Sequence, residues 1–307
     1  MNADMQRSRG VMIAVVAAVI SGFAVFVNGL GVARFDDPTV YTTAKNLIAG
    51  AILVIALVAT TSVASGSRPI SVPRSAWPTL VVIAVLGGSV PFVLFFEGLA
   101  RSTSTNSAFI HKTLVVWVAV GATVFLKERL TWIHVSAIAV LVLGHLMLTG
   151  GLGGATFGSA ELMIFGATLC WATEVLIVKR LLVAVPHQIA AVSRMVGGSA
   201  LLVCWLAVKG DLAELTGFGP HQIAWLLFTG TTLAAFVGTW YCALSLAPTT
   251  DVTSVLVLGA VITGLLNSGF RGVPLTVDSY GYVLIALGAI AVAANAIRAP
   301  RPQQVRA

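Results

Sequence analysis

The chain has 307 residues, of which 58% are hydrophobic and only 9% are charged, and its mean hydropathy is +0.97. A soluble domain carries about 25% charged residues, so this composition excludes an ordinary soluble protein and indicates a protein that crosses a membrane several times. The net charge is +7, but the basic residues are scattered at the ends of apolar segments and form no patch or recognition motif. We therefore expect a lipid bilayer and no nucleic acid as a partner.

Apolar runs follow one another along the whole chain, and a helix of about 20 apolar residues crosses the roughly 30 Å hydrocarbon core of a bilayer. Such helices are predicted at residues 11–32, 41–60, 77–99, 107–126, 132–148, 160–178, 189–208, 223–246, 252–270 and 280–297. The first run follows Arg7 and Arg9, but it is too long for the apolar part of a signal peptide, so we interpret it as the first span. The sequence predicts an all-α integral membrane protein with ten transmembrane helices.

The distribution of Lys and Arg predicts the orientation, because these residues concentrate in cytoplasmic segments. With the N-terminus placed inside, eleven of the 18 fall in cytoplasmic segments, four in outer loops and three inside spans. The three intramembrane cations are Lys45, Lys112 and Arg194. We expect a multi-pass protein of the inner (plasma) membrane with both termini in the cytoplasm, which an even number of spans allows.

The chain resembles itself at an offset close to 147 residues. Residues 99–103 (Leu-Ala-Arg-Ser-Thr) correspond to residues 246–250 (Leu-Ala-Pro-Thr-Thr), and residues 50–54 correspond to residues 198–202. Two five-helix halves are predicted, at residues 1–150 and 159–298, with a Gly-rich linker at 151–158 and a cytoplasmic tail at 299–307. Because five is odd, the second half enters the membrane from the opposite side. Such an inverted repeat is typical of secondary transporters, whose substrate site lies near the midplane between the repeats.

Residues 125–131 are Phe-Leu-Lys-Glu-Arg-Leu-Thr, and Leu143-Gly144 follow in the next predicted helix. This stretch resembles the end of an EamA repeat, whose usual form is an apolar helix, then Gly-Glu-Arg-Leu-Thr, then a helix ending near a Gly. EamA repeats define part of the drug/metabolite transporter superfamily, and the resemblance spans essentially the whole chain as two tandem repeats. The sequence departs from the family at residues 112–116, where members often have Pro. It departs again at residues 270–276, where no Glu matches Glu128.

The resemblance implies export or exchange of small metabolites by alternating access, often driven by an ion gradient. We expect a small-molecule substrate such as an amino acid and no cofactor or metal, while coupling to a proton or another ion stays open. No His-Glu-x-x-His metal motif, Gly-x-Ser-x-Gly nucleophile elbow or Walker phosphate loop occurs in the sequence, so we expect no enzymatic activity and no catalytic residue. An exporter of cationic or amphipathic drugs is the alternative, and a membrane scaffold that transports nothing is a weaker one.

Ionisable side chains inside the predicted spans mark candidate sites, because each costs roughly 2.5–3.5 kcal/mol at the centre of a membrane helix. Glu97 lies near the end of the third span, and His111 and Lys112 lie in the fourth, which runs antiparallel to it after a short turn. Two interpretations stay open. In one, a Glu97–Lys112 ion pair only locks the two helices together. In the other, Lys112 holds an anionic substrate group while Glu97 or His111 titrates during transport.

Glu174 lies deep in the sixth span, either as a cation or proton site facing a cavity or as a partner of Lys179 or Arg194. Lys45 and Arg194, near the starts of the second and seventh spans, are expected to extend to the membrane interface, with cavity lining as the alternative. Polar and aromatic residues within the spans complete the predicted substrate site, although helix packing and interhelical hydrogen bonds are alternative roles for them. These residues are Asn28, Trp117, Trp171, Trp240, Tyr241 and Asn267.

Overall fold

The computed structural model describes residues 3–63, 72–148, 158–272 and 280–298, and these residues form helices without any strand. The first part of the chain contains α1 (Ala3–Gly31), α2 (Pro38–Val63), α3 (Trp77–Ile83), α4 (Val90–Ala100), α5 (Ser104–Lys112), α6 (Leu114–Phe125) and α7 (Trp132–Leu148). The second part contains α8 (Ser159–Leu181), α9 (His187–Val192), α10 (Gly198–Lys209), α11 (Pro220–Leu246), α12 (Thr249–Leu256), α13 (Leu258–Arg271) and α14 (Tyr280–Arg298). Apart from Gly158, the predicted linker and the predicted tail lie outside the described residues.

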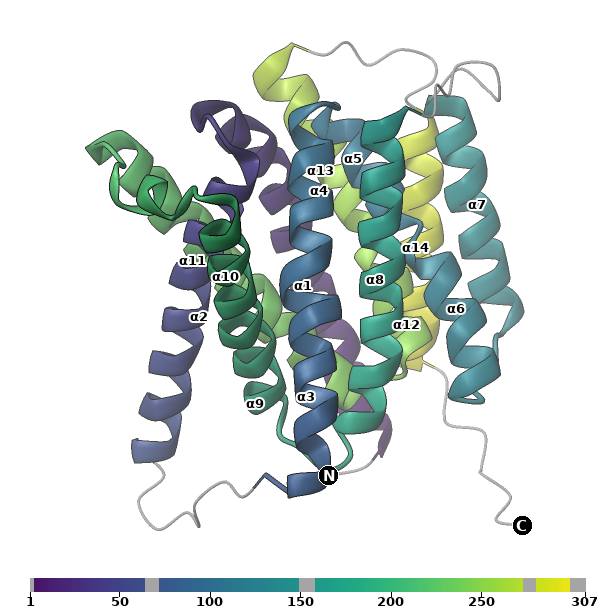
Figure 1. Ribbon diagram of the computed structural model, residues 1–307. Coiled ribbons are helices and arrows are strands. Elements are labelled where there is room, and N and C mark those ends of the chain that lie inside the picture. The colour runs from purple at the N-terminus through teal and green to yellow at the C-terminus, as the bar shows by residue number, and fades with distance from the viewer. Residues whose placement is uncertain (1–2, 64–71, 149–157, 273–279, 299–307) are drawn as a thin grey trace.

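The helices form a bundle in which α1 begins and α14 ends at the same end (Figure 1). We call this the N-terminal end of the bundle and the other the opposite end. Eight stretches of the described chain are long and apolar enough to cross a membrane. The helices α7, with 17 residues, and α14, with 19, pack against each other at one side of the bundle (Figure 1). An all-helical protein with many spans is therefore confirmed, while the count of ten and the inverted relation of the halves stay predictions.

Two of the spans are broken at a single residue. Thr113 separates α5 from α6, and Val257 separates α12 from α13. The Thr113 hydroxyl donates a hydrogen bond of 2.7 Å to the Ile110 carbonyl oxygen, a contact by which Thr side chains bend helices. The first break places Lys112 at the end of a helical segment that is buried along most of its length.

Two other spans contain a π-helical turn, at Ala84–Ser89 between α3 and α4 and at Ser193–Gly197 between α9 and α10. The two turns pack against each other, and glycines allow their backbones to touch. A Cβ atom on Gly88 would overlap the carbonyl oxygen of Arg194, and one on Gly198 would overlap the Gly88 carbonyl group. Small residues let membrane helices approach this closely, and π-helical turns are frequent at functional sites.

We expect Gly88→Ala to destabilise the protein by about 1–3 kcal/mol, the usual cost of overpacking, because the added methyl group would overlap backbone atoms. Gly166→Ala on α8 is the control, since its methyl group would lie 3.6 Å from Leu94 Cδ1, an ordinary contact distance. Thermal unfolding of the purified protein in detergent should have a lower midpoint in Gly88→Ala alone. Equal midpoints for the two variants would contradict the tight crossing of the π-helical turns.

Candidate functional site

A cavity of about 80 Å³ lies among the helices, and one face of α1 forms part of its wall. Ser21, Ala24, Val25 and Asn28 line the cavity with the i, i+3, i+4, i+7 spacing of a single helix face. Aromatic side chains supply much of the remaining wall, namely Phe92, Phe95, Phe96, Trp171, Phe236 and Trp240. Its ionisable residues are Lys45, His111, Glu174 and Arg194. Apolar walls with a few polar groups are typical of sites for small molecules.

Glu174 on α8 is fully buried and is held by two side chains. Arg194 Nη1 lies 3.7 Å from Glu174 Oε2, and the Tyr241 hydroxyl donates a hydrogen bond to Glu174 Oε1. Arg194 Nε and the indole N–H of Trp171 both donate to the carbonyl oxygen of Gly87, each at 3.0 Å. Buried charges need such partners, because the interior does not solvate them. Of the two partners expected for Glu174, Arg194 is the one in contact, and the first π-helical turn provides the acceptor that fixes it.

Lys45 on α2 is 1% exposed and lies against aromatic rings. Its ammonium nitrogen is 3.5 Å from the ring centroid of Phe96 and 5.2 and 5.7 Å from those of Tyr41 and Phe92. It donates a hydrogen bond of 3.1 Å to Asn28 Oδ1, which also accepts the Tyr41 hydroxyl at 2.7 Å. Aromatic faces attract cations, and more strongly when water is excluded. The rings therefore lie where they can stabilise the ammonium group, and no carboxylate of the described residues pairs with it.

Lys112 and His111 at the end of α5 approach the cavity from another side. Lys112 is 1% exposed, and its Nζ donates a hydrogen bond of 2.6 Å to the hydroxyl of Ser21 on the cavity wall. His111 lines the cavity between Phe95 and Trp171, with ring centroids 5.6 and 4.8 Å away. Its Nδ1 atom is buried and has no hydrogen-bond partner among the described residues. Buried polar atoms are rarely left in this state, so a bound solute would have a group to satisfy there.

The ion pair between Glu97 and Lys112 that the sequence suggested does not form. Glu97 Oε2 pairs with Arg101, one turn further along, at 2.6 Å, and Glu97 Oε1 accepts the Thr39 hydroxyl at 3.0 Å. Lys112 turns to Ser21 on α1 instead. Arg101 is the available partner because residues four apart face each other on a helix whatever the alignment of neighbouring helices. Glu97 is also absent from the cavity wall.

The remaining predicted residues divide between the cavity wall and other places. Trp117 is 39% exposed, and its ring packs against Phe165 with 5.5 Å between centroids. Asn267 is buried and joins α13 to α5, because its Nδ2 donates to the Thr105 hydroxyl at 3.0 Å and its Oδ1 accepts the Ser104 hydroxyl at 3.1 Å. The predicted residues that line the cavity, besides His111 and Glu174, are Asn28, Trp171 and Trp240.

Lys45 and Arg194 were assigned to the membrane interface from the sequence, and the structure corrects this. They are 1% and 4% exposed, and both line the cavity. Lys45 lies two turns inside α2, and Arg194 lies within a π-helical turn, so neither is at a helix end from which it could reach the interface. The sequence did contain an indication of their shared location, because Lys45 and Arg194 occupy nearly corresponding positions of the two repeats.

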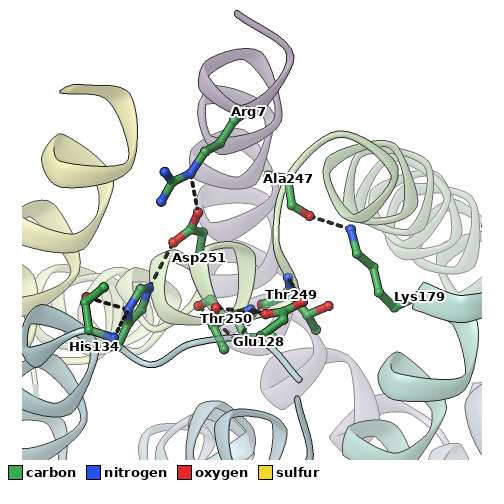
Figure 2. A network of polar contacts seen from close by, with 10 residues as sticks. Arg7, Glu128, His134, Lys179, Ala247, Thr249, Thr250 and Asp251 are labelled. Carbon is green, nitrogen blue, oxygen red and sulfur yellow. Dashed lines mark hydrogen bonds and ion pairs between the residues drawn. The ribbon is translucent and has the colours of Figure 1, made fainter. Parts of the chain in front are cut away.

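At the N-terminal end of the bundle, Glu128 caps helix α12. Its carboxylate accepts the backbone N–H groups of Thr249 and Thr250, each at 3.0 Å, and the Thr250 hydroxyl at 2.9 Å (Figure 2). A helix N-terminus has N–H groups without intrahelical partners and favours negative charge. Glu128 belongs to the turn between α6 and α7, so this contact joins the two halves of the sequence.

Asp251 in the first turn of α12 adds buried ionic contacts beside Glu128. It is 1% exposed and lies between Arg7 and His134, with Arg7 Nε at 2.8 Å and His134 Nε2 at 2.9 Å (Figure 2). Lys179 on α8 donates to the carbonyl oxygen of Ala247 at 2.7 Å, just beyond the end of α11. Side chains from α1, α7 and α8 thus converge on the turn between α11 and α12. We call these contacts, with those of Glu128, the N-terminal network.

The opposite end of the bundle carries a more exposed charge pair. Asp37 precedes Pro38 and caps α2, with its Oδ1 accepting the N–H groups of Thr39 at 2.5 Å and Val40 at 3.0 Å. Its Oδ2 lies 3.0 Å from Lys209 Nζ, and the two side chains are 23% and 35% exposed. Partial burial alone would raise the pKa of Asp37, but hydrogen bonds from Val40, Lys209 and Thr39 lower it below its ordinary value. Exposed pairs of this kind contribute about 0–1 kcal/mol.

We expect Arg194→Ala to destabilise the protein by about 3–5 kcal/mol, because it leaves Glu174 buried without its cation. The exposed pair of Glu97 and Arg101 provides the control, and Arg101→Ala should cost at most about 1 kcal/mol. Thermal unfolding in detergent measures both effects. The double variant Arg194→Ala/Glu174→Ala should recover part of the stability lost in Arg194→Ala. Strictly additive losses would contradict a direct interaction between the two charges.

Comparisons with known proteins agree with this geometry. The EamA-like transporter family matches the chain twice, over residues 8–150 and 158–295. An uncharacterised transporter of Archaeoglobus fulgidus is 24% identical over 196 residues, which cover 62% of this chain and 67% of that protein. A solved crystal structure with 18% sequence identity covers 95% of this chain and 98% of its own with a TM-score of 0.71, which shows a shared fold. The resemblance seen in the sequence is therefore confirmed, and the chain belongs to the EamA-like transporter family of multi-pass membrane proteins.

Proposed function

We propose that this transporter is a secondary exporter or exchanger of small metabolites, such as amino acids, that works by alternating access. The observation that carries the proposal is the origin of the cavity wall, because both halves of the sequence contribute charged side chains to it. Lys45 and His111 come from the first half, and Glu174 and Arg194 come from the second. Secondary transporters bind their substrates at such an interface between repeats.

The proposal includes ten spans arranged as two inverted five-helix halves, with the N-terminal end in the cytoplasm. The common end of the α1 start and the α14 terminus supports an even number of spans (Figure 1). The single-residue breaks between α5 and α6 and between α12 and α13 fall in corresponding helices of the two halves, which supports the repeat. The bias of Lys and Arg supports the orientation. In this orientation the N-terminal network faces the cytoplasm.

The contacts at the two ends differ in strength, and this difference supports an order of opening. At the N-terminal end, Glu128 and the buried Asp251 join the halves through charged groups. At the opposite end, the halves are joined by neutral hydrogen bonds of Asn267, by the partly exposed Glu161, which accepts from Ser102 and Asn106, and by the partly exposed pair of Asp37 and Lys209. Breaking a buried pair costs about 3–5 kcal/mol, whereas an exposed pair contributes about 0–1 kcal/mol. We infer that this state opens more readily at the opposite end.

The cavity wall is less suited to cationic drugs than to neutral or anionic solutes. A site for cations needs negative charge, and Glu174 is the single carboxylate on the described part of the wall. Its carboxylate already contacts Arg194, and a second cation, Lys45, lines the same cavity. A cationic solute would therefore meet repulsion that no free carboxylate offsets.

Wild-type protein in proteoliposomes should accumulate or exchange at least one solute from a panel of labelled amino acids and small metabolites, tested with and without a pH gradient. Glu174→Gln should lower the exchange rate about tenfold or more, because truncating one partner of a buried charge pair costs about 2–5 kcal/mol. Glu97→Gln is the control and should keep wild-type exchange, since Glu97 lies off the cavity wall. Folded wild-type protein that moves no solute of any class would contradict the proposed function.

Loss of the cap on α12 should shift the protein toward the state open at the N-terminal end. We expect Glu128→Gln to increase labelling of a cysteine placed in the cavity, Ser21→Cys, by a membrane-impermeant thiol reagent added on the N-terminal side, in a background without native cysteines. The reason is that the amide lacks the charge that favours the helix N-terminus. Glu214→Gln, at an exposed position, is the control. Equal labelling rates in the two variants would show that Glu128 does not control access.

A further inference from the structure

Lys45 and Lys112 are buried lysines that have no carboxylate partner among the described residues. Each ammonium group has three N–H donors, and each donates one hydrogen bond to a neutral oxygen on α1. Glu174, the single carboxylate on the described cavity wall, already contacts Arg194. When protonated, these lysines give the cavity and its surroundings an excess of positive charge, which is costly in an apolar interior unless an anion offsets it.

The two ammonium groups are held at two heights along one face of α1. Their acceptors, Asn28 and Ser21, are seven residues apart, which is two helical turns or roughly 10 Å along the helix axis. Ala24 and Val25 lie between them on the same face and line the cavity. A solute along this face would meet positive charge toward each end and an apolar surface in between.

The cavity also limits the size and the shape of its occupant. Its volume of about 80 Å³ is far below the roughly 300–1,000 Å³ of pockets that take drug-sized ligands. Phe92, Phe95 and Trp171 surround it with flat apolar faces. His111 adds a buried Nδ1 atom that has no hydrogen-bond partner among the described residues. These features suit a compact solute with one strongly polar end and a short apolar part.

We propose that the cavity selects compact organic anions, with the carboxylate group bound by Lys45 and the apolar part placed against the aromatic wall. Asn28 positions Lys45 for this task, because its Oδ1 takes one of the three N–H donors and leaves two for the solute. Lys112, behind Ser21, adds positive potential at the second height. The inference rests on the transport function proposed above, and it narrows the substrate from small metabolites to carboxylates with a net negative charge.

The first test uses wild-type protein alone, so it does not require a variant to fold. A ligand that binds only the folded state raises the midpoint of thermal unfolding as its concentration exceeds Kd. The midpoint in detergent should rise with propionate and should not rise with propionamide, which has nearly the same shape but no charge. Choline, a compact cation, should also have no effect. Equal shifts with propionate and propionamide would overturn the proposal, because charge would then not be selected.

The second test measures counterflow of labelled pyruvate, glycine and choline in proteoliposomes. Wild-type protein should exchange pyruvate in preference to glycine and choline, and Lys45→Met should lower pyruvate exchange at least about tenfold, since an unpaired buried carboxylate is costly. Lys45→Arg, which keeps the charge, should retain part of the exchange. Arg74→Met is the control and should keep wild-type exchange, because Arg74 is exposed and lies off the cavity wall.

The possible outcomes separate this inference from the proposed function. Exchange of glycine or choline without pyruvate, unchanged in Lys45→Met, would overturn the anion site and leave a transporter. Stabilisation by propionate without exchange of any solute would support the anion site and count against transport. Wild-type protein that is neither stabilised by propionate nor active with pyruvate would overturn the inference.

Discussion

The burial of a few charges in an apolar interior determines how this bundle is built around its centre. Arg194 contacts Glu174 because Gly88 and Gly198 allow the two π-helical turns to touch, and the carbonyl group of Gly87 then receives the guanidinium. Each polar group in the cluster lowers the cost of burying its neighbour, as expected where the surroundings solvate charge poorly. The burial of Lys45 is made less costly in a different way, because aromatic faces stabilise its ammonium group without supplying a negative charge. Arg194 thus has a carboxylate partner in the protein, whereas Lys45 has none among the described residues.

The interruptions of the helices belong to this arrangement. A regular membrane helix satisfies its own backbone groups and presents only side chains to its neighbours. The π-helical turn Ala84–Ser89 instead presents a carbonyl oxygen to Arg194 and Trp171, and the break at Thr113 ends α5 where Lys112 and His111 approach the cavity. These interruptions therefore bring polar backbone and polar side chains to the cavity and its surroundings.

Much of the fold and part of the candidate site could be predicted from the sequence, because apolar runs and the charged residues within them can be recognised without a structure. Apolar runs predicted the helical spans, the motif at residues 125–131 predicted the EamA-like repeats, and the cost of charge in a span predicted the cavity residue Glu174. The ion-pair partner of Glu97 could not be predicted, because it depends on how neighbouring helices are rotated about their axes. In the structure Glu97 pairs with Arg101 and not with Lys112. The depth of Lys45 was misjudged because α2 starts earlier than its apolar run, at Pro38 after the Asp37 cap. The N-terminal network joins residues 68 to 244 positions apart, which no local pattern reports.

Glu128 makes the N-terminal end of the bundle different from the opposite end, although the sequence is repeated. The second repeat has no Glu at the matching position, so the cap on α12 has no counterpart built from the same residue. In the alternating-access cycle proposed above, such a difference would favour one orientation in the absence of solute. The apparent affinity for a solute falls in proportion to the fraction of molecules that present the competent state. The same cavity would then bind solute with a higher apparent affinity from one side of the membrane than from the other.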